Sequence, residues 1–137
     1  MYQIIHVRWN NHVLEILFQD QYLVAINKPS GLLVHRSLID YRETSFAIQL
    51  TRDQIGQRVY PVHRLDKPTS GVLLFALNSD TARIISAQFT AREVKKKYLA
   101  VVRGYADDGD KINYALKEKH NDITNTCLLY TSDAADE

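Results

Sequence analysis

The sequence predicts an α+β (mixed α/β) domain in which strands alternate with two helices. Apolar runs of strand length, rich in branched and aromatic residues, recur along the chain and are separated by short polar turns. Two other segments carry apolar residues at helical spacing. Strands joined partly by hairpin turns favour a mixed sheet over a doubly wound parallel one. With 137 residues, of which 45% are hydrophobic, the chain is long enough to bury one core.

The first half of the chain is predicted to form a hairpin, a short strand and a helix. The expected elements are strands over residues 14–18, 22–28 and 32–35 and a helix over 44–55. A polar turn at 19–21 joins the first two strands, which therefore form a hairpin. The sequence Pro29-Ser30-Gly31 ends the second strand, because proline has no amide proton to donate. Gly56 ends the helix, since glycine adopts positive φ without strain.

The second half is predicted to add a second helix and further strands. The expected elements are strands over residues 72–77, 98–102 and 111–116 and a helix from Ser79 to about Arg92. Ser79 is a suitable N-cap, because its hydroxyl can accept a hydrogen bond from an amide of the first turn. Ala82, Ile85 and Phe89 recur on one side of this helix and are predicted to face the core. A turn over 107–110 separates the last two strands.

Charge and cysteine content exclude several classes of protein. Seventeen basic and sixteen acidic residues leave a net charge of +1, so any contact with nucleic acid must come from local clustering. Cys127 is the only cysteine, which excludes an internal disulfide and indicates a reducing compartment; we expect no bound metal. The start of the chain lacks the pattern of a secretory signal, and no segment reaches the length of a membrane span. We therefore expect a cytoplasmic protein with no membrane contact.

The stretch from Val62 to Leu77 holds the strongest candidate for chemistry. Its polar part is His63-Arg64-Leu65-Asp66-Lys67-Pro68-Thr69-Ser70-Gly71, and it runs directly into an apolar strand. This arrangement presents the Asp66 carboxylate at the edge of the core. A carboxylate there could act as a nucleophile or as a general base on a sugar carbon. The competing interpretation is a turn residue, because aspartate ahead of Lys-Pro is common in turns.

Each of the neighbouring polar residues has two interpretations. Arg64 could pair with a phosphate or stack on a base, or it could be an ordinary surface arginine. His63 could carry a proton, or it could be a hydrogen-bonded structural residue. A basic run follows the second predicted helix and contains Arg92, Lys95, Lys96 and Lys97. This run would attract an RNA backbone, although such runs are often only solvated. Tyr98 could stack on a nucleobase or belong to the core.

Three stretches, in this order, resemble the motifs of one enzyme family. The run from His63 to Leu74 is similar to the signature loop of the RluA-type pseudouridine synthases. Asn27-Lys28-Pro29-Ser30-Gly31 with Val34-His35 resembles the first motif of that family, and Lys96-Lys97-Tyr98-Leu99-Ala100-Val101-Val102-Arg103-Gly104 resembles its tyrosine strand. The resemblance covers roughly residues 14–116. Because no RNA-binding S4-like domain precedes residue 14, the chain looks most similar to the TruC branch, which modifies a uridine in the acceptor stem of tRNA.

The resemblance implies a role for each matched residue. Asp66 corresponds to the catalytic aspartate, Tyr98 to the tyrosine that stacks on the target base and takes part in proton transfer at C5, and Arg64 to the arginine that holds the flipped-out state. The residues expected to contact RNA besides Arg64 are His63, Thr69, Arg92, Lys95, Lys96 and Lys97. The implied reaction breaks the C1′–N1 bond of uridine, turns the base and joins C5 to C1′, with no cofactor or metal. Whether Asp66 attacks C1′ or removes a proton from C2′ stays open.

The chain departs from the family pattern after about residue 116. A later family motif of the type Gly-Arg-x-His-Gln-x-Arg, whose arginine pairs with the catalytic aspartate, has no counterpart here. We therefore expect residues 14–126 to be a truncated catalytic domain, residues 1–13 a non-homologous extension, and residues 127–137 a non-native tail. Alone, such a fragment should fold poorly and be inactive, because an incomplete sheet exposes an edge and an apolar face. A full-length protein is expected to be monomeric.

Other functions would use the same residues. A ribosomal RNA pseudouridine synthase of the same family would carry the same loop. A non-catalytic RNA-binding remnant would keep the basic run but would not need Asp66, whose presence with Arg64 and Tyr98 favours the enzyme. A general carboxylate hydrolase would need a second acid nearby, and the loop contains none.

Overall fold

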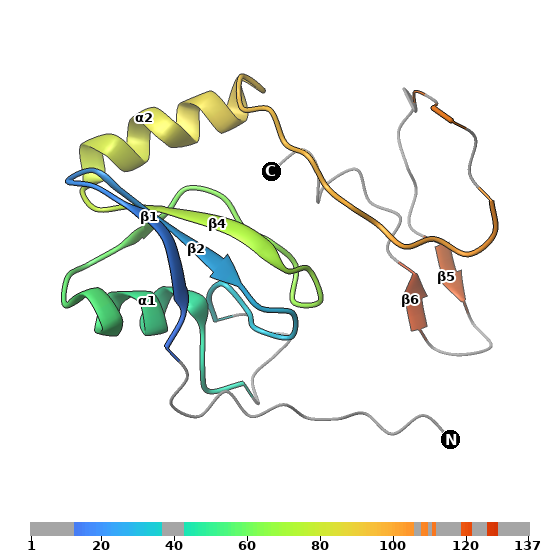
Figure 1. Cartoon of the computed structure of the whole chain (residues 1–137), viewed down its shortest axis with the longest axis horizontal. Helices are drawn as coiled ribbons and strands as arrows, with labels where there is room; N and C mark the ends of the chain where they lie inside the picture. Colours follow the sequence, from blue (N-terminus) through green and yellow to red (C-terminus); the bar gives the residue numbers. More distant parts are fainter. Residues whose placement is uncertain are drawn as a thin grey trace.

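The computed structural model describes residues 13–36, 43–105, 108, 109, 111, 119–121 and 126–128. Its elements are β1 (Glu15–Gln19), β2 (Leu23–Lys28), α1 (Ala47–Ile55), β3 (Tyr60–Pro61), β4 (Gly71–Ala76), α2 (Ser79–Thr90), β5 (Lys119–Asn121) and β6 (Thr126–Leu128). The first four strands form one sheet in the order β1-β2-β4-β3, and every pairing in it is antiparallel (Figure 1). The α+β class and the antiparallel sheet with flanking helices are confirmed. No helix in the described part of the chain is long and apolar enough to cross a bilayer.

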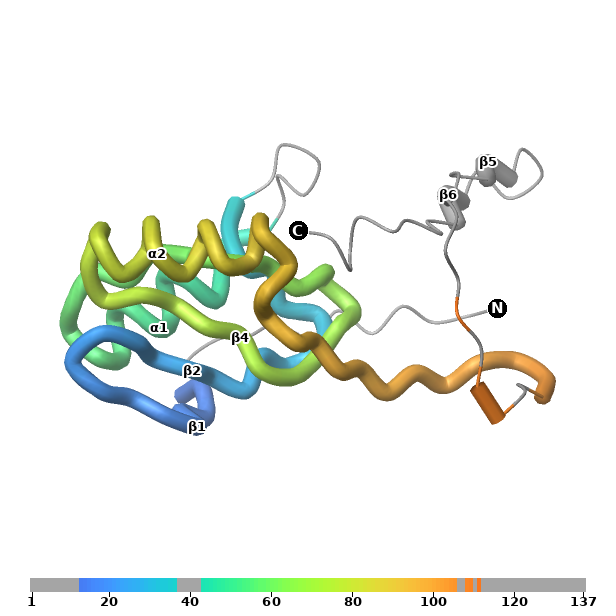
Figure 2. The backbone as a smooth tube through the Cα atoms, turned by 90° about the horizontal axis from the view of Figure 1, so that it is seen from above, coloured from blue at the N-terminus to red at the C-terminus, as the bar shows by residue number. Residues whose placement is uncertain are grey.

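The predicted hairpin is present as β1 and β2. Asp20 forms the turn, because its Oδ1 accepts hydrogen bonds from the amides of Tyr22 and Leu23, both at 2.7 Å. The ladder shifts register between Ile16 and Phe18, where β1 carries a bulge. β2 then pairs along its whole length with β4, and Figure 2 shows β4 lying between α2 and the β1–β2 hairpin.

The core lies between the sheet and α1. Val24 and Ile26 of β2 and Leu73 and Phe75 of β4 are fully buried, and Ala47 of α1 packs into the same cluster. These alternating positions point to one side of the sheet, as the period of a strand requires. Gln54 joins α1 to the start of β1, because its side-chain amide exchanges two hydrogen bonds of 2.8 Å with the backbone of residue 14.

The first helix begins later than the sequence predicts, and the strand predicted over 32–35 is wrong. Only an isolated parallel bridge between Leu33 and Phe46 forms there. The amides of Ala47 and Ile48 donate to the carbonyls of Leu33 and Val34, so this segment serves the first turn of α1 rather than a sheet. Extended Phe46 is therefore the N-cap, while Gly56 ends the helix in the left-handed conformation with φ of 70°, as predicted.

The second helix also starts from a different cap. Asn78, not Ser79, is the N-cap of α2: its Oδ1 accepts the amide of Thr81 at 2.8 Å, and Ser79 lies in the first turn. The helix ends at Thr90, two residues short of the predicted end. The stripe predicted to face the core is only half-buried, and the strands that α2 mainly contacts are β4 and the short strand β3. Ala82, Ile85 and Phe89 form this stripe.

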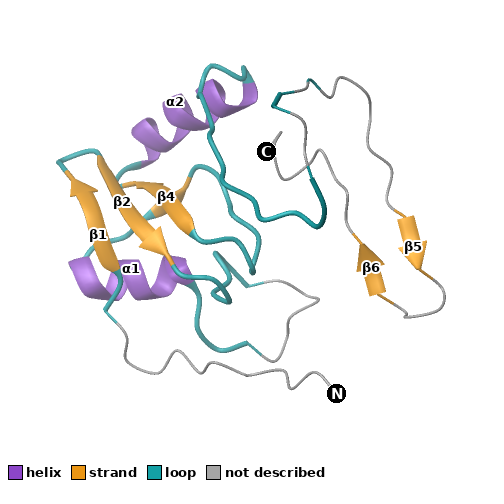
Figure 3. Cartoon of the chain, turned by 45° about the vertical axis from the view of Figure 1, so that its right-hand side comes forward, coloured by secondary structure: helices purple, strands orange, loops and turns teal. Residues whose placement is uncertain are grey.

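The strand predicted over 98–102 is wrong. This segment leaves α2 as an irregular, exposed stretch (Figure 3). Its apolar alternation suits a strand, but a strand needs a neighbour for its amide and carbonyl groups, and no strand in the described part of the chain pairs with it. Most of the strand predicted over 111–116, and residues 107 and 110 of the predicted turn, lie outside the described residues. The antiparallel pair of β5 and β6 is not predicted by the sequence pattern.

Candidate functional site

Asp66 lies at the turn of an exposed loop that leads into β4. Its carbonyl accepts the amide of Thr69 at 3.0 Å, which closes a turn over Lys67 and Pro68. The Asp66 side chain is exposed, while the preceding Leu65 is buried in the core. The sequence-based interpretations of Asp66 as a turn residue and as a presented carboxylate are therefore compatible.

The turn between β2 and the following segment supports the Asp66 loop. The amide of Gly31 donates to the carbonyl of Lys67 at 2.7 Å, and the hydroxyl of Ser30 donates to the carbonyl of Pro68 at 2.7 Å. From the other side, the Lys67 ammonium pairs with Glu43 at 2.8 Å. Two stretches that are far apart in sequence thus hold one loop, and the Asp66 carboxylate is presented on a braced backbone.

Beneath this loop lies a fully buried lysine that the sequence analysis does not single out. Lys28 Nζ donates to the carbonyls of Leu32 at 2.7 Å, Pro29 at 3.1 Å and Lys67 at 3.3 Å. An ammonium group has three N–H donors, so these carbonyls satisfy it. Burial lowers the pKa of Lys28 to about 8, and the nearby Asp66 carboxylate acts in the opposite direction. Its burial could have been predicted from its position, because Lys28 continues the alternation of the buried residues Val24 and Ile26 along the strand.

His63 joins the loop to both β4 and α2. Its Nε2 accepts the amide of Leu74 at 3.0 Å, and its ring stacks on Phe89 with centroids 4.7 Å apart. Burial lowers the pKa of His63, a hydrogen bond to the backbone of Arg64 opposes this shift, and the charge of Lys96 adds to it. The ring is therefore neutral at pH 7, and its acceptor nitrogen is already used. These contacts favour the interpretation of His63 as a hydrogen-bonded structural residue.

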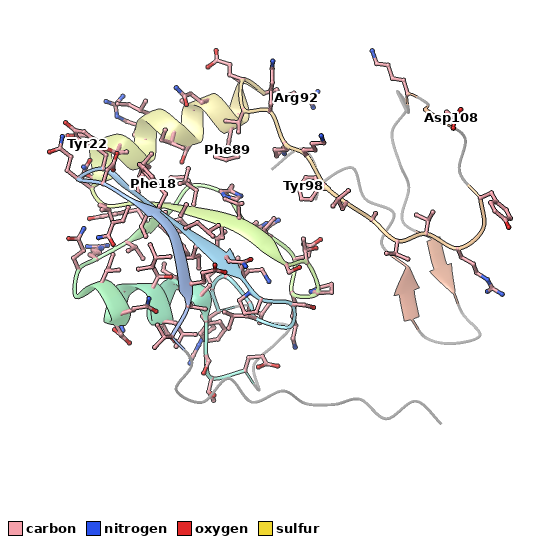
Figure 4. The ribbon with its side chains drawn as sticks, in the orientation of Figure 1. Phe18, Tyr22, Phe89, Arg92, Tyr98 and Asp108 are labelled. Carbon is pink, nitrogen blue, oxygen red and sulfur yellow. The ribbon has the colours of Figure 1, made fainter. Side chains whose placement is uncertain are left out.

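The stacked pair of His63 and Phe89 lines two hollows. The loop hollow, of about 860 Å³, is also lined by Thr69, the three lysines of the basic run and Tyr98. The arginine hollow, of about 500 Å³, is also lined by Arg64 and Arg92. Figure 4 shows Phe89 pointing from α2 toward the sheet, with Tyr98 on the segment that follows the helix.

The predicted site residues are thus divided between two places. Tyr98 is half exposed on the wall of the loop hollow, and Arg64 belongs to the other hollow. The basic run is split in the same way, since Arg92 lines the arginine hollow and the three lysines line the loop hollow. Asp66 borders neither hollow itself, although its neighbours Leu65 and Thr69 line the loop hollow. The sequence predicts Phe89 as a core residue. The structure shows in addition that Phe89 lines both hollows, which the sequence does not indicate.

Comparison with known proteins identifies the family. The sequence profile described as RNA pseudouridylate synthase matches residues 22–134, which includes the Asp66 loop, α2 and Tyr98. The chain belongs to the RNA pseudouridylate synthase family. Membership confirms the resemblance that the loop sequence suggested.

Close relatives of this chain are found in bacteria. It is 61% identical over 104 residues to tRNA pseudouridine synthase C of Pasteurella multocida and 60% identical over 105 residues to that of Haemophilus influenzae. These matches cover 76% and 77% of this chain but 43% and 44% of the relatives. The chain therefore spans somewhat less than half the length of these curated relatives. Among solved structures, human RNA pseudouridylate synthase domain containing 4 is 36% identical, with a TM-score of 0.45 over 58% of this chain and 30% of that one.

The loop and the loop hollow together offer a carboxylate, an aromatic ring and three lysines. An exposed carboxylate on a loop can act on a nucleotide only once that nucleotide has left its stack. An aromatic side chain on the wall offers a face for stacking, and lysines offer charge for phosphates. Among the described residues, no group of histidine, cysteine or acidic side chains is placed to hold a metal ion.

Proposed function

We propose that the protein to which this chain belongs converts uridine to pseudouridine in RNA, and that its substrate is a uridine in the acceptor stem of tRNA. One observation carries the proposal: the Asp66 carboxylate stands on a doubly braced loop whose residues Leu65 and Thr69 line the same hollow as Tyr98 and three lysines. Family membership supports the reaction type. The names of the two relatives above, each a tRNA pseudouridine synthase C, support the choice of tRNA, and we propose the cytoplasm as the place of the reaction.

In this proposal the loop hollow receives the target nucleotide. A uridine in a stem must leave the base stack before a side chain can reach its sugar, and unstacking costs a few kcal/mol. Tyr98 offsets part of that cost by stacking on the base. Lys95, Lys96 and Lys97 add contacts to the phosphates, which position the strand without reading its sequence.

Asp66 acts on the sugar of the flipped nucleotide. As a nucleophile it would attack C1′ and release the base, whereas as a base it would take a proton from C2′. In either case the C1′–N1 bond breaks and the base turns. In the nucleophilic route, C5 then attacks C1′ and displaces the Asp66 carboxylate; in the other route, C5 adds to C1′ of the glycal and the proton returns from Asp66 to C2′. The proton on C5 then leaves and N1 gains one, so the product is an isomer of uridine. Arg64, which lines the arginine hollow, would help to keep the target nucleotide flipped out, as the family resemblance implies.

The test places this chain in a complete relative. The matching segment of the Pasteurella multocida protein is replaced by the residues of this chain, and the chimaera is given tRNA carrying tritium at C5 of uridine. We expect tritium release, which reports loss of the C5 proton. Asp66→Asn should abolish release while tRNA binding persists, and Asp53→Asn, an exposed residue on α1, should leave both unchanged. Release at the normal rate by Asp66→Asn would refute the assignment.

A further inference from the structure

The turn after β2 holds the carbonyl groups of the two residues that follow Asp66 in the chain. The amide of Gly31 donates to the Lys67 carbonyl at 2.7 Å. The hydroxyl of Ser30 donates to the Pro68 carbonyl, also at 2.7 Å. Both bonds join residues that are far apart in sequence, so they fix the Asp66 loop against the end of β2.

One planar peptide group links Ser30 to Asp66. The carbonyl of Pro68 and the amide of Thr69 belong to the same peptide group, which is planar and rigid. Its oxygen accepts the hydroxyl of Ser30, and its nitrogen donates to the carbonyl of Asp66 at 3.0 Å. The two hydrogen bonds fix this plane at both ends, and each strengthens the other by polarising the group between them. The orientation of Asp66 therefore depends on Ser30 through a single rigid unit.

Ser30 differs from Lys28, which also binds the loop from this turn. The side chain of Lys28 is buried and donates to carbonyls of its own turn as well, so it supports the fold. Ser30 is exposed. An exposed hydroxyl or carbonyl group that loses its partner in the protein can bind water instead, so the bond from Ser30 adds little to stability. What this bond supplies is a fixed position of the loop.

We propose that Ser30 is a positioning residue for the reaction of Asp66: its hydroxyl orients the loop so that the carboxylate meets the sugar of the target nucleotide. This inference rests on the proposed function. Reacting atoms must lie about 3–3.5 Å apart, and a misplacement of about 1 Å can cost about 10²-fold in rate. The amide of Gly31 still holds the Lys67 carbonyl when the Ser30 hydroxyl is removed, so we expect a smaller loss, of about tenfold.

Two substitutions of Ser30 in the chimaera test this role. Ser30→Ala should lower kcat for tritium release about tenfold and leave KM and the melting temperature close to those of the unsubstituted chimaera. It should also speed hydrogen exchange of the Thr69 amide, measured by NMR. Ser30→Thr keeps a hydroxyl at a position that is not left-handed, so it should restore both kcat and slow exchange. Ser79→Ala is the control, because Ser79 is an exposed serine outside the loop and both hollows.

An unchanged kcat in Ser30→Ala would overturn the proposal, and so would a loss that Ser30→Thr does not recover or that Ser79→Ala shares. A raised KM with unchanged kcat would make Ser30 an RNA contact and would overturn it too. If the unsubstituted chimaera releases no tritium, the proposed function fails. Exchange of the Thr69 amide then decides alone whether Ser30 positions the loop: faster exchange in Ser30→Ala supports this, and an unchanged rate overturns it.

Discussion

The imidazole of His63 stacks on the phenyl ring of Phe89, with ring centroids 4.7 Å apart and ring planes inclined by 18°. His63 also accepts the amide of Leu74, so the polar loop, β4 and α2 meet at one neutral side chain. The same pair forms the wall shared by the two hollows. The relative positions of the loop and the helix therefore depend on this contact.

Replacing Phe89 by alanine should destabilise the protein and alter His63. Phenylalanine-to-alanine changes in cores cost about 3–5 kcal/mol, and Phe89 is half-buried, so we expect a loss of about 2 kcal/mol in urea denaturation. The pKa of His63 should rise toward 6.5, because burial is the main cause of its lowering; an NMR titration measures this. Ile84→Ala, at an exposed position of the same helix, is the matched control and should change stability by less than about 0.5 kcal/mol. An unchanged His63 titration would contradict the role of the stack.

The pKa of His63 predicts how stability depends on pH. In the folded protein this pKa lies below 6.5, so as the pH falls the unfolded chain binds its proton first. Stability that is present above pH 6.5 should therefore be lost progressively as the pH falls toward the folded value. Comparing urea denaturation of the wild type with that of His63→Gln isolates this contribution. Lys96→Gln should reduce it, because the charge of Lys96 helps to lower the pKa of His63.

Local pattern predicts much of this fold, and its errors are informative. The hairpin, both helices and β4 follow from apolar periodicity and turn residues. Asn78 and Ser79 are both competent caps, and only the backbone path into α2 decides between them. The segment over 98–102 has the composition of a strand, but pairing is a property of the neighbours and not of the segment.

The candidate site could be predicted only where its residues are neighbours in the sequence. The loop motif locates Asp66, because the residues around it are contiguous in sequence. The support of that loop by Lys28 and Ser30, and the contact of His63 with Phe89, join residues that are far apart in sequence. Closeness in sequence suggests that the basic run shares one surface, whereas Arg92 lines the arginine hollow and Lys95, Lys96 and Lys97 line the loop hollow.

Replacing Lys28 by methionine should weaken the fold beneath the Asp66 loop. Methionine fills a similar volume but leaves the carbonyls of Pro29, Leu32 and Lys67 without the ammonium donor. Unsatisfied buried carbonyl groups cost about 1–3 kcal/mol each, so we expect a loss of about 3 kcal/mol in urea denaturation. Lys95→Met, at an exposed lysine, is the control and should have little effect. A variant as stable as the wild type would show that these bonds contribute nothing.

Lys28 should also make the wild type more stable at alkaline pH, relative to Lys28→Met. Its pKa is about 8 in the folded protein and 10.5 as the ordinary value, so between these values the unfolded chain still holds a proton that the folded protein has released. The free energy of unfolding therefore rises with pH in this window, by up to about 3 kcal/mol, and is unaffected by Lys28 below it. Subtracting the curve of the methionine variant removes the titration of the other groups. A flat difference between pH 8 and 10.5 would contradict the lowered pKa.

Two substitutions of Tyr98 separate stacking from proton transfer in the chimaera. Tyr98→Leu removes the ring and should weaken tRNA binding by about 1–3 kcal/mol, the usual contribution of one stacked base. Tyr98→Phe keeps the ring, so tRNA binding should persist while tritium release slows by about 10²–10⁴-fold, the usual contribution of a general acid or base. Tyr105→Phe is the control, since Tyr105 is fully exposed and lies outside both hollows. Full activity in Tyr98→Phe would exclude the hydroxyl from proton transfer and leave Tyr98 as a stacking residue only, because the ring alone would then account for its place on the wall of the loop hollow.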